Sequence, residues 1–442
     1  MPLTRLEGAR LVTEASENES IMSPQSKELL RRVKDHFKNE IEYRDIYYLN
    51  PVESAKAMYA YTSDSAHALN YNNRGKDLSS GSNYSLSIVS SGRLNRNFSF
   101  FFNPQVRYPE DARDTATDGT VIEVLEGYGS LTFGNMELTV GRESLWWGPG
   151  YHGALLISNN AKPFDLIKIT NPEPTLLPWL FSYLGPFKFT AFATRLESQR
   201  DLRKPYLTGL RLDLKPHPLF SVGLSRVAMF GGGGRKVDFG TVVDAFLARN
   251  ENSASEPGNQ LASVDVKLVI PWDLQPFVFY SEIGGEDEAG MLPSHIGYIA
   301  GVYLPRVIGA KQLALRGEYA DNHVKNKPGV WYTHHIYSTG YKYKGEIIGH
   351  HMGSDARDIF FEATLNAGRP GSFIFSFDSE TTGLQNNVKA KNRTALFSWV
   401  KEFERGLKLS AGYAVDWRKN IDSIEGNNLT PHSIWAGLDY NF

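Results

Sequence analysis

From about residue 54 to the end of the chain, apolar and polar residues alternate with the two-residue period of a β-strand. Residues 84–88, 98–102 and 136–140 show this pattern in the first half, and residues 373–377 and 407–417 show it in the second. Roughly 16 to 19 such segments can be counted, most of them about 9 to 11 residues long, which suits tilted strands that cross a bilayer. The pattern predicts an all-β chain.

Two architectures accommodate so many alternating strands: a propeller or sandwich in water, or a closed barrel in a membrane. One face of the predicted strands is rich in Phe, Leu and Trp, and the other carries Arg, Lys, Asp and Ser, as lipid outside and water inside a barrel require. Trp399 and Trp417 fall at strand ends, where an interfacial aromatic girdle belongs. No internal repeat of about 40 residues indicates a propeller. We predict a large transmembrane antiparallel β-barrel.

The chain divides into an N-terminal part, residues 1–50, and a barrel with inserted loops, residues 51–442. The first 20 residues are polar and are expected to lack regular structure. Residues 23–41 predict one amphipathic helix on the periplasmic side, because Ser23 and Pro24 suit a helix start and an apolar stripe follows. That stripe consists of Leu30, Val33, Phe37 and Ile41.

Connections between the predicted strands are uneven in length. Residues 369–371 form a tight Pro-Gly turn, whereas residues 251–260 and 418–431 are long and polar. Such alternation suits a barrel with periplasmic turns and extracellular loops. The final strand, residues 434–442, ends in Phe442 and resembles the segment by which the barrel assembly machinery recognises bacterial outer-membrane proteins.

Composition removes several classes of function. The formal charge is −2, from 47 basic and 49 acidic residues, so nothing favours nucleic acid as a partner. The chain has no cysteine, which excludes disulfides and Cys-ligated zinc. No apolar run reaches the roughly 18 residues of a membrane helix, and no signal peptide is visible at the start. No cofactor is predicted.

Three motifs that could indicate phosphate binding, metal binding or catalysis are better explained without such a role. The glycine run 231–234 lacks the Gly-Lys-Ser/Thr order of a phosphate-binding loop, so we interpret it as an ordinary loop. The pairs at 334–335 and 350–351 are adjacent histidines, which point to opposite faces when extended, so no metal site is predicted. No G-x-S-x-G elbow is present, and no catalytic residues are predicted.

The least strand-like stretch is residues 141–160, in which Trp146 and Trp147 precede a Gly-Pro-Gly break. Two neighbouring indoles need either a core to pack on or a ligand to bind. With Tyr151 and Trp179 they could form an aromatic platform for sugar rings, and polar neighbours could bond sugar hydroxyls. Alternatively, the stretch is a structural plug inside the barrel.

Polar residues predicted on inward positions, such as Arg211, Arg226, Arg316, Glu318, Asp321 and Asn322, allow the same two interpretations: a wall of mutually paired charges or a sugar-binding surface. The candidate carbohydrate-binding residues are Glu143, Trp146, Trp147, Tyr151, His152, Asn159, Asn160, Arg226, Arg316, Glu318 and Asn322.

Several stretches resemble the Wzi family of capsule-assembly proteins, outer-membrane β-barrel lectins of Gram-negative bacteria. The most specific is WWGPGYHG followed by LLISNN, and LRRVKDHF, SVGLSRVAMFGGGGR and GEYADN keep the family's order. The resemblance implies a barrel of 18 strands with periplasmic-side helices, which associates polysaccharide with the cell surface without catalysis. Only one clear helix precedes the first strand here, which departs from a full helical bundle.

These observations leave three functional hypotheses. The first is a non-enzymatic outer-membrane protein that binds capsular polysaccharide or another exopolysaccharide and helps to attach or assemble it. The second is a porin or exopolysaccharide export channel, and the third is an outer-membrane enzyme. Under the first hypothesis, the expected partners are the polysaccharide, outer-membrane lipid and the barrel assembly machinery, and the chain is expected to be a monomer.

Overall fold

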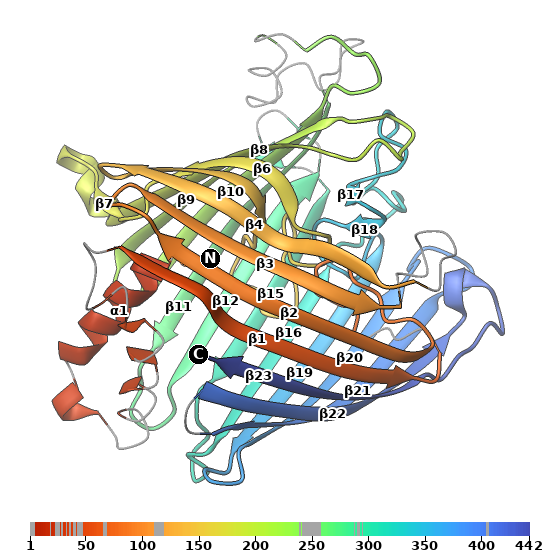
Figure 1. Cartoon of the computed structure of the whole chain (residues 1–442). Coiled ribbons are helices and arrows are strands. Elements are labelled where there is room, and N and C mark those ends of the chain that lie inside the picture. Colours follow the sequence, from red (N-terminus) through yellow and green to blue (C-terminus); the bar gives the residue numbers. More distant parts are fainter. Residues whose placement is uncertain are drawn as a thin grey trace.

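The computed structural model is a closed β-barrel with its N-terminal helix near one end and long loops at the other (Figure 1). Among the residues that the structure describes, no helix is both long and apolar enough to span a membrane. The described residues are 5–17, 19–22, 27, 30–31, 33–34, 37–38, 41, 47–64, 69–109, 119–237, 240, 258–286, 288–289, 292–293, 295–403 and 406–442.

Strands dominate the regular structure. The helices are α1 (Arg5–Glu17) and the 3-10 helices η1 (Glu19–Ile21), η2 (Trp179–Leu184) and η4 (Ile421–Ser423). The strands are β1 (Tyr48–Thr62), β2 (Gly81–Arg93), β3 (Phe98–Tyr108), β4 (Val121–Phe133), β5 (Met136–Glu143), β6 (Phe164–Thr170), β7 (Thr175–Leu176), β8 (Pro186–Arg195), β9 (Tyr206–His217), β10 (Phe220–Phe230), β11 (Gly258–Ile270), β12 (Phe277–Glu286), β13 (Glu288–Ala289), β14 (Leu292–Pro293), β15 (Ile296–Leu304), β16 (Leu313–Asp321), β17 (Lys342–Tyr343), β18 (Glu346–Ile347), β19 (Ala356–Asn366), β20 (Ser372–Thr382), β21 (Ala390–Glu402), β22 (Leu407–Lys419) and β23 (His432–Asn441).

The barrel closes where the first strand pairs with the last. Ala57 of β1 lies opposite Leu86 of β2 on one side and Leu438 of β23 on the other. The short strand β7 pairs with β8 beside β6, so 18 strands make up the circumference. Closure pairs both edges of the sheet, as a spanning β-structure in lipid requires. The predicted antiparallel barrel of about 18 strands is confirmed.

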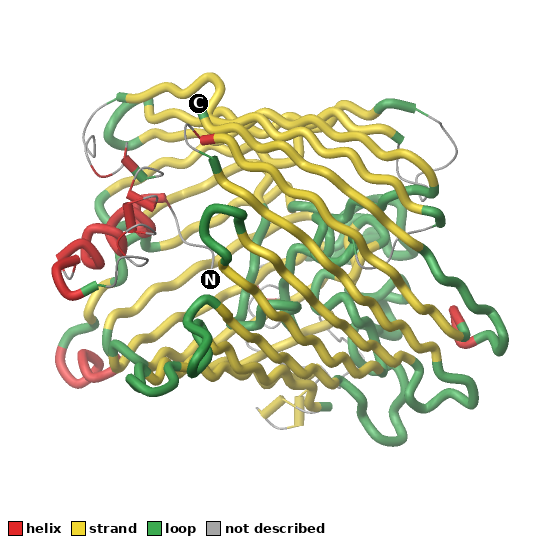
Figure 2. The backbone as a smooth tube through the Cα atoms, turned by 90° about the horizontal axis from the view of Figure 1, so that it is seen from below, coloured by secondary structure: helices red, strands yellow, loops and turns green. Residues whose placement is uncertain are grey.

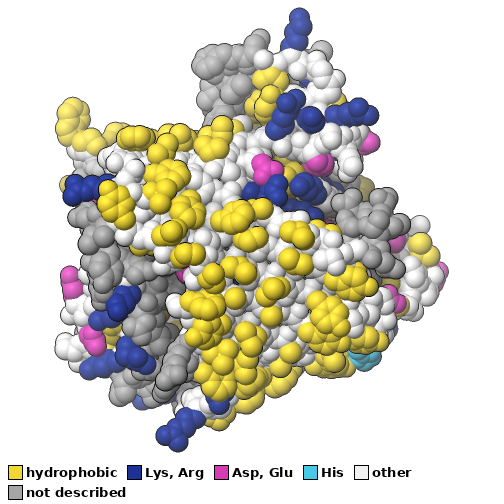
Figure 3. Space-filling view, in the orientation of Figure 1, with side chains coloured by type: hydrophobic (Ala, Val, Ile, Leu, Met, Phe, Trp, Pro, Cys, Tyr) yellow, Lys and Arg dark blue, Asp and Glu magenta, His cyan; other side chains and the backbone are white. Residues whose placement is uncertain are grey.

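The barrel wall is apolar outside and polar inside, because successive residues of a strand point to opposite faces. On β2, Leu86 is 48% exposed whereas the next residue, Ser87, is 7% exposed. Figure 3 shows apolar side chains spread over the outside of the strands. Inside, the buried Arg211 of β9 lies 2.6 Å from Asp265 of β11 and also bonds Asp213. The wall therefore confirms that Arg211 faces inward and that lumenal charges pair with one another.

Connections at the two ends of the barrel differ in length. At one end, which we call the short-turn end, β4 and β5 join through residues 134–135, and β20 follows β19 after residues 367–371. At the other, the long-loop end, residues 144–163 and 322–355 connect consecutive wall strands. The C-terminus and α1 lie toward the end opposite β17 and β18 (Figure 1).

The N-terminal part contains more helix than the sequence indicates. Residues expected to be irregular form α1, in which Ala9 and Val12 are buried. In the predicted helix 23–41, the described residues include 30, 33 and 41 in helical conformation, whereas Ser23 and Pro24 lie outside the described residues. Gly8 of α1 lies against the ring of Phe37, where a Cβ atom would come within 2.5 Å of it. This close packing explains why a polar segment folds as a helix.

Loss of the buried lumenal cation should destabilise the barrel. Arg211→Met leaves Asp265 buried without its counter-charge, and we expect the free energy of unfolding to fall by about 3–5 kcal/mol. Denaturant unfolding in detergent micelles measures it. The matched control is Lys56→Gln, which breaks the exposed Lys56–Asp439 pair and should cost about 1 kcal/mol or less. Equal losses for both variants would contradict the paired lumenal wall.

Candidate functional site

Two long connections at the long-loop end fold into the barrel and pack on each other. We call residues 144–163 the first inner segment and residues 322–355 the second inner segment; Figure 2 shows loop segments within the ring of strands. Their shared core includes Trp147 and Trp331, which are 2% and 0% exposed, and the run Leu155–Ile157, which is fully buried. This core continues into the wall, where Trp147 meets Phe192 of β8 edge-on at 5.3 Å.

Hydrogen bonds to backbone carbonyl groups join the two inner segments to each other. Ser158 N donates to the carbonyl oxygen of Ile348 at 2.9 Å, and the Tyr332 hydroxyl donates to the carbonyl of Leu155 at 2.7 Å. Residues 69–80 add a third layer, since Arg74 N donates to the carbonyl of Asn159 at 2.7 Å. The three segments form one packed unit.

Carboxylates of the barrel wall accept the backbone N–H groups of this unit. Glu318 of β16 accepts from the consecutive N–H groups of Tyr151, His152 and Gly153 at 2.8, 3.1 and 3.2 Å. Glu282 of β12 accepts from Leu155 N at 3.1 Å. A loop placed inside a barrel loses water as a partner for its backbone, so these carboxylates replace that water.

The Gly-Pro-Gly break lets the first inner segment approach the wall closely. At Gly148, whose φ is +119°, an added Cβ atom would lie 2.6 Å from a carboxylate oxygen of Glu282. At Gly153, it would lie 2.2 Å from the ring of His350. Residues with side chains do not fit at these two positions, and Gly148 also needs the left-handed backbone that favours glycine.

The most accessible aromatic group of the first inner segment is Tyr151, which is 46% exposed. The Arg316 guanidinium lies 3.8 Å from the Tyr151 ring and 4.3 Å from that of Tyr303, and the Tyr151 hydroxyl donates to Glu362 at 3.0 Å. Tyr303 is one residue from the end of β15 at the short-turn end. This Tyr151 cluster therefore faces the short-turn side of the packed unit.

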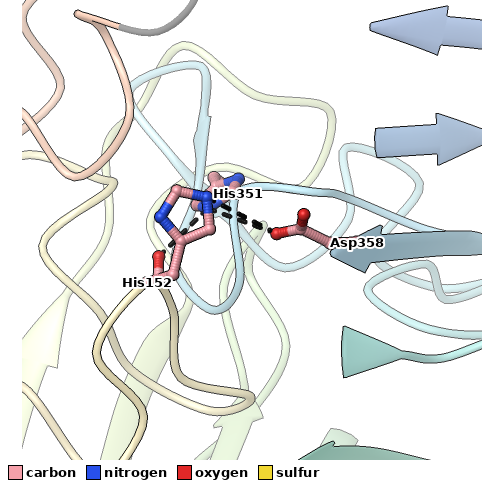
Figure 4. Close-up of side chains that lie close together, drawn as sticks. All are labelled: His152, His351 and Asp358. Carbon is pink, nitrogen blue, oxygen red and sulfur yellow. Dashed lines mark hydrogen bonds and ion pairs between the residues drawn. The ribbon is translucent and has the colours of Figure 1, made fainter. Parts of the chain in front are cut away.

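Histidines and carboxylates meet where the two inner segments touch the wall (Figure 4). His152 Nε2 and His351 Nε2 lie 3.6 and 3.9 Å from the same oxygen of Asp358 on β19. Each of these three residues offers one ligand atom, and the three atoms lie within 4.8 Å of one another. Burial, reinforced by the nearby His351 and His152, lowers the pKa of the neighbouring His350 well below its usual range.

The candidate residues predicted from the sequence fall into separate places. Trp147, Asn160, Glu318 and Asn322 are buried, and their contacts are those of the packed unit and its wall. Glu143 bonds Lys168, and Arg226 bonds Gln260, both as members of the lumenal wall. Trp146, His152 and Asn159 are half-buried. Tyr151 and Arg316 come together, whereas Trp179 lies on η2 at the short-turn end, 90% exposed.

The sequence alone does not predict the histidine–aspartate cluster. On a strand, the adjacent histidines at 350–351 would point to opposite faces, but they lie in an irregular turn and their rings are 4.5 Å apart. Asp358 carried no local signal, because it occupies an ordinary inward position of a strand. The pair at 334–335 also lies outside any strand, and its rings stack at 4.6 Å.

A closed antiparallel barrel with an apolar exterior and two inner segments packed inside it defines an outer-membrane barrel with a folded unit in its lumen. The chain belongs to the capsule assembly protein Wzi family, whose model matches residues 55–431. This membership confirms the resemblance seen in the sequence, and the outer membrane is its location.

Two comparisons with solved structures show the same fold. One is Wzi, an outer membrane protein that is involved in group 1 capsule assembly in Escherichia coli and is a carbohydrate-binding β-barrel. It is 20% identical to this chain, with a TM-score of 0.75 over 100% of this chain and 93% of that one. The outer membrane protein OprD of Pseudomonas aeruginosa is 10% identical, with a TM-score of 0.52 over 90% of this chain and 94% of that one.

A sequence relative is an uncharacterised 55.8 kDa protein in the cps region of Klebsiella pneumoniae. It is 30% identical over 189 residues, which are 42% of this chain and 38% of that protein. The match thus spans well under half the length of the relative.

Removal of the Glu318 carboxylate should loosen the first inner segment. In Glu318→Ala, the N–H groups of residues 151–153 lose their shared acceptor, and each buried donor left unpaired costs about 1–3 kcal/mol. We expect faster hydrogen–deuterium exchange over residues 144–163 in the folded barrel, measured by mass spectrometry.

Glu362→Ala is the control, since among the described hydrogen bonds it removes the one to the Tyr151 hydroxyl and leaves the backbone acceptor in place. Unchanged exchange at residues 151–153 in folded Glu318→Ala would show that Glu318 does not hold the segment.

Proposed function

We propose that this protein binds capsular or another exported polysaccharide at the outer face of the outer membrane and helps to hold or assemble it there, without catalysing a reaction. The observation that carries this proposal is the packed unit in the lumen, with Trp147 and Trp331 in its buried core. A barrel filled by its own core offers a polymer a surface rather than a passage. Membership of the capsule assembly family, and the carbohydrate-binding fold relative from Escherichia coli, support the same ligand class.

The surface that we propose for the polymer lies on the long loops. Exposed cations gather at the end of β8 and on the described parts of the β8–β9 and β10–β11 connections, which touch where Gly233 N donates to the carbonyl oxygen of Arg203 at 2.8 Å. Figure 3 shows Lys and Arg side chains on this protruding part of the molecule. The exposed members of this basic loop patch are Arg195, Arg203, Lys204, Arg235 and Lys236.

The charge of the basic loop patch favours an acidic polysaccharide. The whole chain carries a formal charge of −2, so this concentration of cations is local and not a property of the overall composition. Positive surface groups attract a polyanion over about a Debye length, and the attraction weakens as salt rises. Sugar carboxylates or phosphates would be bound through arginine and lysine side chains.

The other expected partners follow from the barrel itself. We propose that the short-turn end faces the periplasm, as the short connections of bacterial barrels do. Outer-membrane lipid surrounds the apolar wall, and the barrel assembly machinery inserts the barrel into the membrane. A sheet with no free edge supports a monomer.

Charge reversal on the basic loop patch should weaken polysaccharide binding. For Arg203→Glu/Lys204→Glu/Lys236→Glu we expect at least a tenfold loss of affinity for purified acidic capsular polysaccharide, together with loss of the salt dependence of binding. Biolayer interferometry at two salt concentrations measures both.

A matched triple variant, Lys215→Glu/Lys311→Glu/Arg369→Glu, reverses exposed cations at the short-turn end and should bind as the wild type does. Equal losses in both triple variants would remove the case for a local site. If Tyr151→Ala abolishes binding while the loop variant retains it, the contact lies inside the barrel at the Tyr151 cluster.

The export-channel alternative makes the opposite prediction for ion flow. With the packed unit in place, the wild-type protein should carry no large, steady current in planar bilayers. Deletion of residues 146–158, with a short Gly-Ser bridge, should open the lumen and produce one. A large steady current from the wild type would favour a channel and count against the proposed function.

A further inference from the structure

The histidine–aspartate cluster joins three separate parts of the molecule. His152 comes from the first inner segment, His351 from the second inner segment and Asp358 from wall strand β19 (Figure 4). Among the residues that the structure describes, these three form a group whose ligand atoms converge within 4.8 Å. The two imidazole nitrogens lie 3.6 and 3.9 Å from Asp358 Oδ2, which is too long for a hydrogen bond.

These separations are close to those of a metal site. Zinc bonds to imidazole nitrogen and carboxylate oxygen are about 2.0–2.2 Å long, which places two ligand atoms of a tetrahedral ion roughly 3.3 Å apart. Small side-chain rotations would bring His152 and His351 to that distance from the Asp358 oxygen. Imidazole and carboxylate ligands together suit a first-row divalent ion.

Buried polar atoms around the cluster have no hydrogen-bond partner. They include His152 Nε2, His350 Nε2 and both carboxylate oxygens of Asp358 and of Asp378. Asp358 is 2% exposed and Asp378 is 4% exposed. Buried carboxylates whose oxygens accept no hydrogen bond are unfavourable, and a bound divalent cation would compensate for this group of acids.

The groups behind His351 match the outer shell of a metal-binding histidine. Its Nδ1 lies 2.8 Å from Glu380 Oε1. In metal sites, a carboxylate in this position orients the imidazole ring so that its other nitrogen, here Nε2, faces the metal ion. Tyr71 stacks on the His351 ring at 4.0 Å and bonds Glu380 through its hydroxyl. His351 Nε2 also lies 3.0 Å from the carbonyl oxygen of His152. Because a carbonyl can only accept a hydrogen bond, Nε2 carries the proton in this contact, and a metal ion bound to Nε2 would replace that proton.

We propose that His152, His351 and Asp358 bind one divalent transition-metal ion of the zinc type, which fastens both inner segments to the barrel wall. Asp378 lies outside this group of three, but its Oδ1 is 3.5 Å from His152 Nε2, and a rotation of its side chain would supply a fourth bond. Four protein ligands make a closed, structural site. The role of the ion is to hold the packed unit in place, and this role does not depend on the identity of the polysaccharide.

Metal content is the direct test. Full-length protein without a histidine tag, purified from outer membranes without chelator, should contain about one equivalent of zinc per chain by elemental mass spectrometry. After chelator treatment, added Zn²⁺ should restore the equivalent and raise the unfolding temperature. Co²⁺ in its place should give the visible absorption of a tetrahedral site. Wild-type protein that neither retains zinc nor responds to Zn²⁺ or Co²⁺ would overturn the proposal.

Variants assign the ligands. His152→Gln and Asp358→Asn should each lower zinc affinity by more than about tenfold, and Glu380→Gln, acting through His351, should lower it by about 10–100-fold. His334→Gln/His335→Gln, which changes a histidine pair outside the cluster, is the matched control and should bind zinc as the wild type does. Wild-type affinity in His152→Gln, or equal loss in the control, would contradict the assignment. If a ligand variant does not fold, the Co²⁺ spectrum of the wild type still decides whether the site exists.

Discussion

The structure depends on wall carboxylates that accept hydrogen bonds from a backbone placed inside the barrel. Residues 144–163 leave the wall and cross the lumen, where their N–H groups no longer meet bulk water. Glu318 accepts three consecutive N–H groups and Glu282 accepts another, so the segment is held by its main chain and not only by its side chains. Without such acceptors, each of these buried N–H groups would lack a partner, at a cost of about 1–3 kcal/mol.

Once the main chain is held, the apolar side chains of the inner segments can form a core inside a polar lumen. Trp147 and Trp331 fill this core, and it continues into wall residues such as Phe192 and Leu207. The lumen therefore holds both this apolar core and groups of buried acids. The histidine–aspartate cluster lies among the acids, where the packed unit meets strands β19 and β20.

Much of the fold could be predicted from the sequence, and less of the site could be. The period of two along residues such as 407–417 revealed the strands, and the inward position of Arg211 followed from the same period. The helix at Arg5–Glu17 was missed, because its apolar residues are few and its partner, Phe37, is distant in sequence. For residues 141–160, the sequence left a plug and a sugar platform equally open, and the burial of Trp147 places it in the plug.

The sequence by itself determined the all-β class, the closed wall and its membrane-facing side, because each of these depends on alternation between neighbouring residues. It also carried the family likeness in the WWGPGYHG stretch. Only the tertiary structure decided that this stretch lies inside the barrel and which groups it meets there. His152, His351 and Asp358 come from distant parts of the chain, and their convergence depends on how two loops fold into one lumen. No local pattern encodes that meeting, because it is set by the closure of the whole barrel.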